Sequence, residues 1–348
     1  MNNAKRGMIP PYSIFFLFYI SRVVVSLTYI QTICAGFMCS DLLISIVLSF
    51  FMTLILSVPS YLCYKKGIVI NNRFLGVLYC AFFIIKTSVN ISRFSGFATS
   101  RLNPTSSSFF FAILIGIAIC YCAYLGIEGL SRFSVYAGFS VIFATVLILS
   151  LNFNNIKTIN LFPIIQNEQR NILYNALIMT ANSIESAVLI CLVNRVNGSV
   201  KKSFYMSMFA QYLTLFLLVF TAVCVLGSNA ILQPYPIFTL FQMATGSTLS
   251  RLDIIHTSFW VLAVLIKCSL LIYCASISIK KFSHSKKCIV FTAISVIVSV
   301  ALSEIFVSQI MLVSKQISIF IYLIFCVIIP IFLLIFNGKR GRKVEKNI

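Results

Sequence analysis

Ten stretches of about 20 mostly apolar residues follow one another along this 348-residue chain. A helix rises about 1.5 Å per residue, so such a stretch crosses a hydrocarbon core about 30 Å thick. Short strands of alternating polarity, which build membrane β-barrels, are absent. The sequence therefore predicts an all-α integral membrane protein with ten transmembrane helices, at about 12–35, 41–64, 74–96, 109–127, 133–152, 172–194, 204–227, 254–279, 288–309 and 317–336.

The charge pattern agrees with a membrane protein and argues against binding to nucleic acid. Charged residues make up 10% of the chain, against about 25% in soluble domains. The net charge is +20, but the basic residues form short clusters between the apolar stretches rather than one patch. With a cytoplasmic N-terminus, 18 of the 27 basic residues lie inside and six outside. This split predicts that both termini are cytoplasmic and that residues 337–348 form a basic tail at the anionic lipid surface.

The order of the helices predicts one transmembrane domain over residues 1–348, built from two halves. Helices 1–5 cover about 12–152, and helices 6–10 cover about 172–336. Because each half has an odd number of helices, corresponding helices run in opposite directions. This is the pattern of a five-plus-five inverted repeat, in which ligands bind near the bilayer midplane.

Ionisable residues inside the helices point to the same place. Arg22, Lys86, Glu185 and Lys267 lie about halfway along the first and third helices of each half, and Glu304 lies in the ninth helix. Such residues are costly in lipid and usually face a cavity or a partner. We expect the first four to meet near the midplane.

Helix 6 contains a polar run, Asn182-Ser183-Ile184-Glu185, at its centre. Asn and Ser compete with the helical backbone for hydrogen bonds, so an unwound turn is expected there. In helix 1, Ser26 is a further polar candidate, although ordinary hydrogen bonding between helices is the simpler explanation for it. The candidate ligand-binding residues are therefore Arg22, Ser26, Lys86, Asn182, Ser183, Glu185 and Lys267.

The role of Glu185 stays open between two interpretations. Its carboxylate either binds the ammonium group of a ligand or pairs internally with Arg22, Lys86 or Lys267. With three cations and one anion, the cavity favours a ligand that carries a carboxylate.

Other residue patterns predict neither a cofactor nor a metal site. The twelve cysteines contain no C-x-x-C pair, and His256 and His284 lie at opposite helix ends. Mid-membrane His residues and paired Asp residues are absent, which argues against an intramembrane enzyme. We further expect an ion pair between Glu128 and Arg132, four residues apart, and a short helix over the pocket at Ile237–Ala244.

Several ordered motifs resemble the B subunit of spore germinant receptors, the GerAB-like family of the amino acid–polyamine–organocation superfamily. The resemblance runs from Pro11 to Phe336, and it rests on the order and spacing of the motifs Gly126-Ile127-Glu128-Gly129-Leu130-Ser131-Arg132, Asn160-Leu161-Phe162-Pro163-Ile164-Ile165, Ser183-Ile184-Glu185, Tyr235-Pro236 and Arg251-Leu252-Asp253. Two positions depart from the family pattern: Arg22 replaces a small residue, and Ser250 replaces a residue that is often acidic.

The resemblance implies a LeuT-like fold and a role in sensing a small germinant, commonly an amino acid. It also implies an A subunit and a lipoprotein C subunit as partners, in the spore inner membrane or the cell membrane. The same scaffold supports an amino acid secondary transporter, which is the alternative function.

Overall fold

The structure is a computed structural model that describes residues 8–28, 40–70, 72–163, 169–193, 195–243, 252–279 and 287–336. Apart from one isolated pairing of Ile9 with Val196, these residues form only helices, turns and connecting segments. The helices are α1 (Pro11–Thr28), α3 (Ser40–Lys65), α4 (Arg73–Phe97), η2 (Ala98–Leu102), α5 (Ser108–Leu151), η3 (Phe153–Asn155), η4 (Thr158–Leu161), α6 (Gln169–Ala181), α7 (Glu185–Cys191), α8 (Lys201–Leu226), α9 (Asn229–Leu232), α10 (Pro236–Met243), α11 (Leu252–Ser278), α12 (Lys287–Tyr322) and η6 (Leu323–Ile328).

Apolar helices long enough to cross a membrane dominate this part of the chain. Seven of them meet that description by length and composition, and Pro11–Val24 and Val290–Ile305 are shorter apolar helices. The predicted all-α membrane fold is therefore confirmed, while the count of ten spans stays a prediction. The predicted tail at 337–348 lies outside the described residues.

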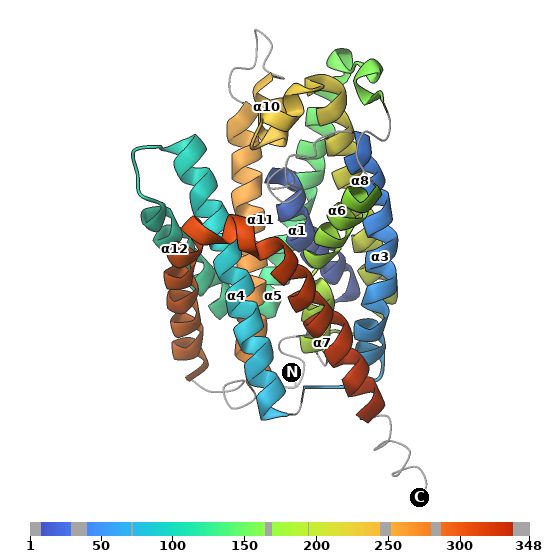
Figure 1. Ribbon diagram of the computed structural model, residues 1–348. Coiled ribbons are helices and arrows are strands. Elements are labelled where there is room, and N and C mark those ends of the chain that lie inside the picture. The colour runs from blue at the N-terminus through green and yellow to red at the C-terminus, as the bar shows by residue number, and fades with distance from the viewer. Residues whose placement is uncertain are drawn as a thin grey trace, which may run out of the picture.

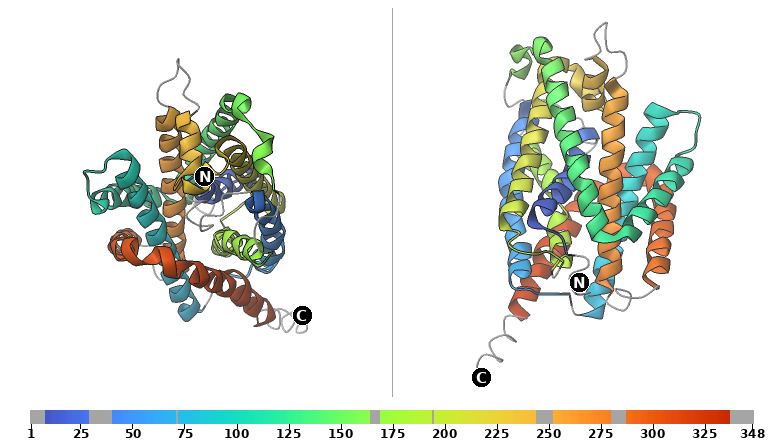
Figure 2. Two further views of the ribbon diagram at one scale, coloured as in Figure 1. Left: turned by 45° about the horizontal axis from the view of Figure 1, so that its top comes forward. Right: turned by 180° about the vertical axis from the view of Figure 1, so that it is seen from behind.

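The predicted fourth and fifth helices run together in α5. Its only non-helical residue is Gly126, with φ +78° and ψ −177°. A positive φ is strained for residues with a Cβ atom, so glycine allows the chain to turn here. Figure 2 shows the two halves of α5 meeting at a sharp angle.

The C-terminal part differs from the prediction. We expected a loop at 310–316 between two helices, but the backbone of α12 is helical from Lys287 to Tyr322. Figure 1 shows that this long helix bends, so that both of its arms point toward the lower end of the bundle. A continuous helix keeps the backbone hydrogen bonds satisfied through the bend, which a loop in lipid would not do.

Small and polar residues set how closely the helices pack. The face of α3 that meets α6 and α8 carries a hydroxyl residue at nearly every turn, namely Ser45, Ser49, Thr53, Ser57 and Ser60, and all are buried. Each hydroxyl donates to a carbonyl of α3 or of a neighbouring helix. Small hydroxyl side chains let membrane helices approach closely without leaving unpaired polar groups.

The most enclosed elements are α1 and α7. α1 packs against α5, α8 and α11, and α7 packs against α3 and α11. The left view of Figure 2 shows α1 near the middle of the bundle. Six of the seven residues of α7 are buried, as is most of α1 up to Val24. The fold therefore places most residues of α7, and of α1 up to Val24, away from the surface of the protein.

Candidate functional site

The predicted interruption of helix 6 is present. α6 ends at Ala181, and α7 begins at Glu185. Between them the N–H of Asn182 donates to the carbonyl of Met179, and the N–H of Ser183 donates to that of Thr180. The amide of Asn182 folds back onto α6 and donates to the carbonyl of Ile178 at 2.9 Å. The polar run thus ends one helix with tight turns and starts another in the bundle interior.

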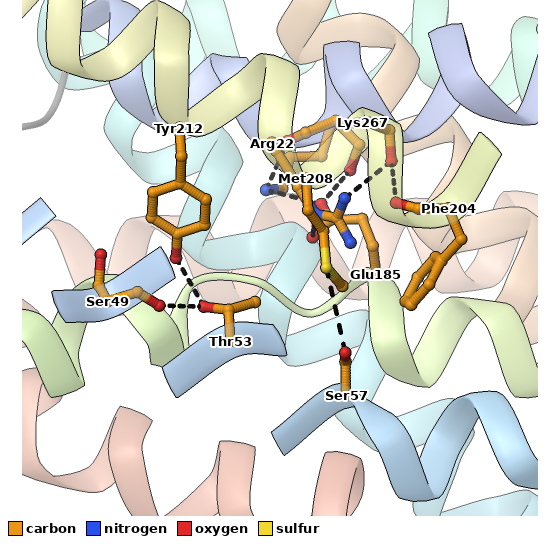
Figure 3. A network of polar contacts seen from close by, with 11 residues as sticks. Arg22, Ser49, Thr53, Ser57, Glu185, Phe204, Met208, Tyr212 and Lys267 are labelled. Atoms are coloured by element: carbon orange, nitrogen blue, oxygen red, sulfur yellow. Dashed lines mark hydrogen bonds and ion pairs between the residues drawn. The ribbon is translucent and has the colours of Figure 1, made fainter. Parts of the chain in front are cut away.

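The first residue of α7, Glu185, is fully buried and accepts hydrogen bonds from α1. Ser21 Oγ donates to its Oε1 at 2.6 Å, and Arg22 Nε donates to its Oε2 at 3.2 Å. The ammonium of Lys267 on α11 lies 3.7 Å from Oε1. Figure 3 shows Arg22 and Lys267 converging on this carboxylate. A buried carboxylate needs such charged and hydrogen-bonding partners to stay ionised.

The guanidinium of Arg22 reaches a third element, α8. Its Nη1 donates to Ser207 Oγ at 2.9 Å, and its Cζ lies 5.3 Å from the ring centroid of Phe204 and 5.8 Å from that of Phe18. These distances are within the range of cation–π attraction. Its remaining nitrogen, Nη2, is buried and has no hydrogen-bond partner among the described residues.

The ammonium of Lys267 bridges α11 and α1. It donates to the backbone carbonyl of Ser21 at 2.8 Å, in addition to its contact with Glu185. Because Ser21 offers both its hydroxyl and its carbonyl, one turn of α1 is tied to α7 and α11 together. We call Ser21, Arg22, Glu185, Ser207 and Lys267 the central cluster.

Three of the four mid-helix charges expected to meet therefore do so. The fourth, Lys86 on α4, is buried, with 8% of its surface exposed, and its ammonium makes no hydrogen bond or ion pair with any residue that the structure describes. Ser183 lies buried in the turn, outside the hydrogen bonds of the cluster. The side chain of Ser26 lies outside the described residues. Whether these seven residues bind a ligand stays a prediction.

Sequence reasoning missed Ser207 and Phe204. The charge of Arg22 implies that some acceptor must lie near it, but nothing in the local pattern of α8 singles out Ser207 among the other small residues. Phe204 is one of 33 phenylalanines in the chain, so composition gives no signal for it.

An aromatic layer covers one side of α1 above the cluster. Trp260 on α11 is fully buried, and its Nε1 donates to the carbonyl of Val24 at 3.3 Å. Its ring lies 4.7 Å from that of Phe97, which also contacts Tyr235 and Phe238. Phe238 belongs to α10, the short helix predicted at Ile237–Ala244 and observed at Pro236–Met243. The layer separates the cluster from the end of the bundle at which α10 lies.

The sequence matches the family described as "Spore germination protein" over residues 8–308. No curated protein matches the chain. Among solved structures, a Na⁺-coupled sialic acid symporter in its substrate-bound outward-open state is similar, with a TM-score of 0.59 and 11% identity, over 92% of this chain and 79% of that chain. A nucleobase-cation-symport-1 family transporter, closed with bromovinylhydantoin bound, gives a TM-score of 0.54 and 10% identity, over 93% of this chain and 78% of that one.

These two likenesses establish the fold, and the matched family covers most of the chain. The interruption of α6–α7 beside an enclosed α1 is the arrangement expected of that fold. The chain belongs to the spore germination protein family and has the LeuT-type transporter fold.

Proposed function

We propose that this chain is the germinant-sensing membrane subunit of a spore germination receptor, and that its ligand is an amino acid. One observation carries the proposal: the break between α6 and α7 lies beside a fully buried Arg22–Glu185–Lys267 contact. Buried charges and broken helices inside a membrane protein both reduce stability, and they mark ligand sites more often than structural ones.

Glu185 has little capacity left for a ligand, because its two oxygens face donors from Ser21, Arg22 and Lys267. The ammonium group of an amino acid would instead meet the C-terminal end of α6 near Asn182 and Ser183. The C-terminal end of a helix carries partial negative charge, and a carbonyl that already accepts one hydrogen bond from the turn has a second lone pair for the ammonium. The carboxylate would meet the guanidinium of Arg22, whose planar fork suits it.

Binding at Arg22 would also explain how the receptor is triggered. A ligand carboxylate competes with Glu185 for the same guanidinium, and that contact joins α1 to α7. Weakening it would allow α1 to move relative to α7 and α11, which shifts the population between two arrangements of the bundle.

The test is amino acid binding by the full-length protein in lipid nanodiscs, measured as a ligand-dependent rise in melting temperature. We expect at least one amino acid to bind, and Arg22→Lys to weaken that binding about tenfold, because lysine keeps the charge but loses the fork. Glu128→Gln, which alters an exposed pair, is the matched control. A folded Arg22→Lys protein with unchanged affinity would contradict the assignment of this site.

The second candidate is an amino acid secondary transporter, which the fold of the two similar transporters favours. Uptake into liposomes separates the two functions. Concentrative uptake of an amino acid would show that the chain is a transporter rather than a sensor. We expect no dependence on Na⁺, since the Ser21 carbonyl and the Glu185 carboxylate already face the ammonium of Lys267. A coupling cation would need the same oxygen ligands.

We further propose that the chain is not an enzyme and acts with an A subunit and a lipoprotein C subunit in the spore inner membrane or the cell membrane. The excess of basic residues on one side supports cytoplasmic termini. Copurification of the three subunits and protease access to a C-terminal tag would test this proposal. A tag cleaved from outside intact cells would overturn the orientation.

A further inference from the structure

Lys86 is a buried amine that the central cluster does not pair. Its side chain is more than nine-tenths buried in α4, and no described residue pairs with it. Phe94, eight residues after Lys86 on α4, stacks on Trp260, seven residues before Lys267 on α11, so the two lysines lie at the same level of these neighbouring helices. Arg93 on the same helix and Lys267 are both positive, and the remaining group near Lys86 is the thiol of Cys326. Lys86 therefore stands in a field that repels its own charge.

The one buried carboxylate nearby cannot serve as its counter-ion. Glu185 already faces three donors, and one nitrogen of Arg22 still lacks a partner. Arg22 and Lys267 thus share one carboxylate, and Lys86 has no carboxylate partner among the described residues. An unpaired buried charge costs far more free energy than a lost hydrogen bond, so a second negative charge would stabilise this region.

The sequence of α4 extends the positive field toward η2. Arg93 lies seven residues after Lys86, which places it on the same face two turns away, and Arg101 follows in η2. Residues 73–102 contain no Asp or Glu. A run of one sign of charge beside low-dielectric walls concentrates ions of the opposite sign.

We propose that Lys86, beside Lys267, forms a binding site for one small monovalent anion, which is either a halide ion or the side-chain carboxylate of an acidic amino acid ligand whose other carboxylate meets Arg22. An anion there pairs with the free ammonium and lowers the repulsion between the two lysines. This site differs from the Arg22 site of the proposed function, and only its carboxylate form rests on that function.

The first experiment uses halide alone and the full-length protein in nanodiscs. Sodium bromide replaces sodium gluconate at constant ionic strength, and both the melting temperature and the fluorescence of Trp260 are recorded. Trp260 is the only tryptophan, lies seven residues before Lys267 on α11, and stacks on Phe94 of α4 at 5.6 Å. We expect both signals to change saturably with bromide, because an ion that binds only the folded state stabilises it.

Variants separate a specific site from a general salt effect. Lys86→Met should raise the half-saturating bromide concentration at least about tenfold, which equals about 1.4 kcal/mol. Lys86→Arg keeps the charge and should retain saturable binding. Lys202→Met removes an equal charge from an exposed position at the start of α8 and should behave as wild type.

A second arm identifies the source of the anion. If bromide weakens the binding of glutamate competitively and leaves that of alanine unchanged, the side-chain carboxylate of the ligand occupies the Lys86 site. If the two bind independently, a free halide occupies it. Both outcomes support the site.

The proposal is overturned if wild type shows no bromide-specific response while folded Lys86→Met binds amino acids with unchanged affinity. Lys86 would then be a neutral packing residue, and the proposed function would still stand. Saturable bromide binding in a protein that binds no amino acid would leave the anion site standing and would contradict the proposed function.

Discussion

Two ion pairs of the same chemistry occupy opposite environments in this protein. Arg22 and Glu185 are 3.2 Å apart, with side chains at most 1% exposed, whereas Arg132 and Glu128 are 2.8 Å apart, with side chains 76% and 48% exposed. The exposed pair is the shorter one, yet water and salt screen it, and such pairs contribute about 0–1 kcal/mol. The buried pair joins α1 to α7 and leaves costly unpaired charges if one partner is removed. Distance is therefore a poor guide to what an ion pair does, and burial is a better one.

Removal of the buried carboxylate is the strongest test of the difference between the two ion pairs. We expect Glu185→Gln to reduce the free energy of unfolding by about 3–5 kcal/mol, because Arg22 and Lys267 then lose their shared anion. The yield of monodisperse protein and its melting temperature in detergent measure the effect. A melting temperature equal to that of wild type would show that the buried pair contributes no more than an exposed one.

Replacement of all three charges should cost much less than removal of one. The triple variant Arg22→Met, Glu185→Leu, Lys267→Met leaves no buried charge unpaired within the cluster, so we expect its stability to lie within about 2 kcal/mol of wild type. The variant should no longer bind an amino acid. Its melting temperature and its ligand binding, measured side by side, therefore separate the effect on stability from the effect on function. A triple variant as unstable as Glu185→Gln would mean that the cluster is needed for folding itself.

The hydrogen bond from Arg22 to Ser207 offers a smaller test of the buried pair. Ser207→Ala removes the acceptor of Arg22 Nη1 and should cost about 1–2 kcal/mol, because a second guanidinium nitrogen then lacks a partner. Ser140→Ala on the exposed face of α5 is the control, since Ser140 bonds only within its own helix. Equal melting temperatures for the two variants would refute the role of Ser207.

The exposed pair should give the smallest effect. Glu128→Ala is expected to change stability by no more than about 0.5 kcal/mol, and the change should vanish in high salt. Melting temperatures at low and high ionic strength provide the measurement. A loss comparable to that of Ser207→Ala would place Glu128 in a contact beyond its pair with Arg132.

Much of the local structure followed from the sequence. The polar run at Asn182 and Ser183 predicted the helix break, and Pro236 marked the start of a short helix. The continuous helix across 310–316 did not follow, because the polar residues Ser314, Lys315 and Gln316 divide two apolar stretches at that point. Helical hydrogen bonding through the bend overrides such a local preference when the backbone has no water to bond to.

The sequence by itself determined that this chain forms apolar helices and that its few internal charges must face inward, because lipid does not solvate them. Only the tertiary structure decided which charges meet. Glu185 contacts Arg22, 163 residues away, and Lys267, while Lys86 remains unpaired among the described residues. Partner choice depends on how each helix is rotated and crossed against its neighbours, and the packing of whole helices sets those angles.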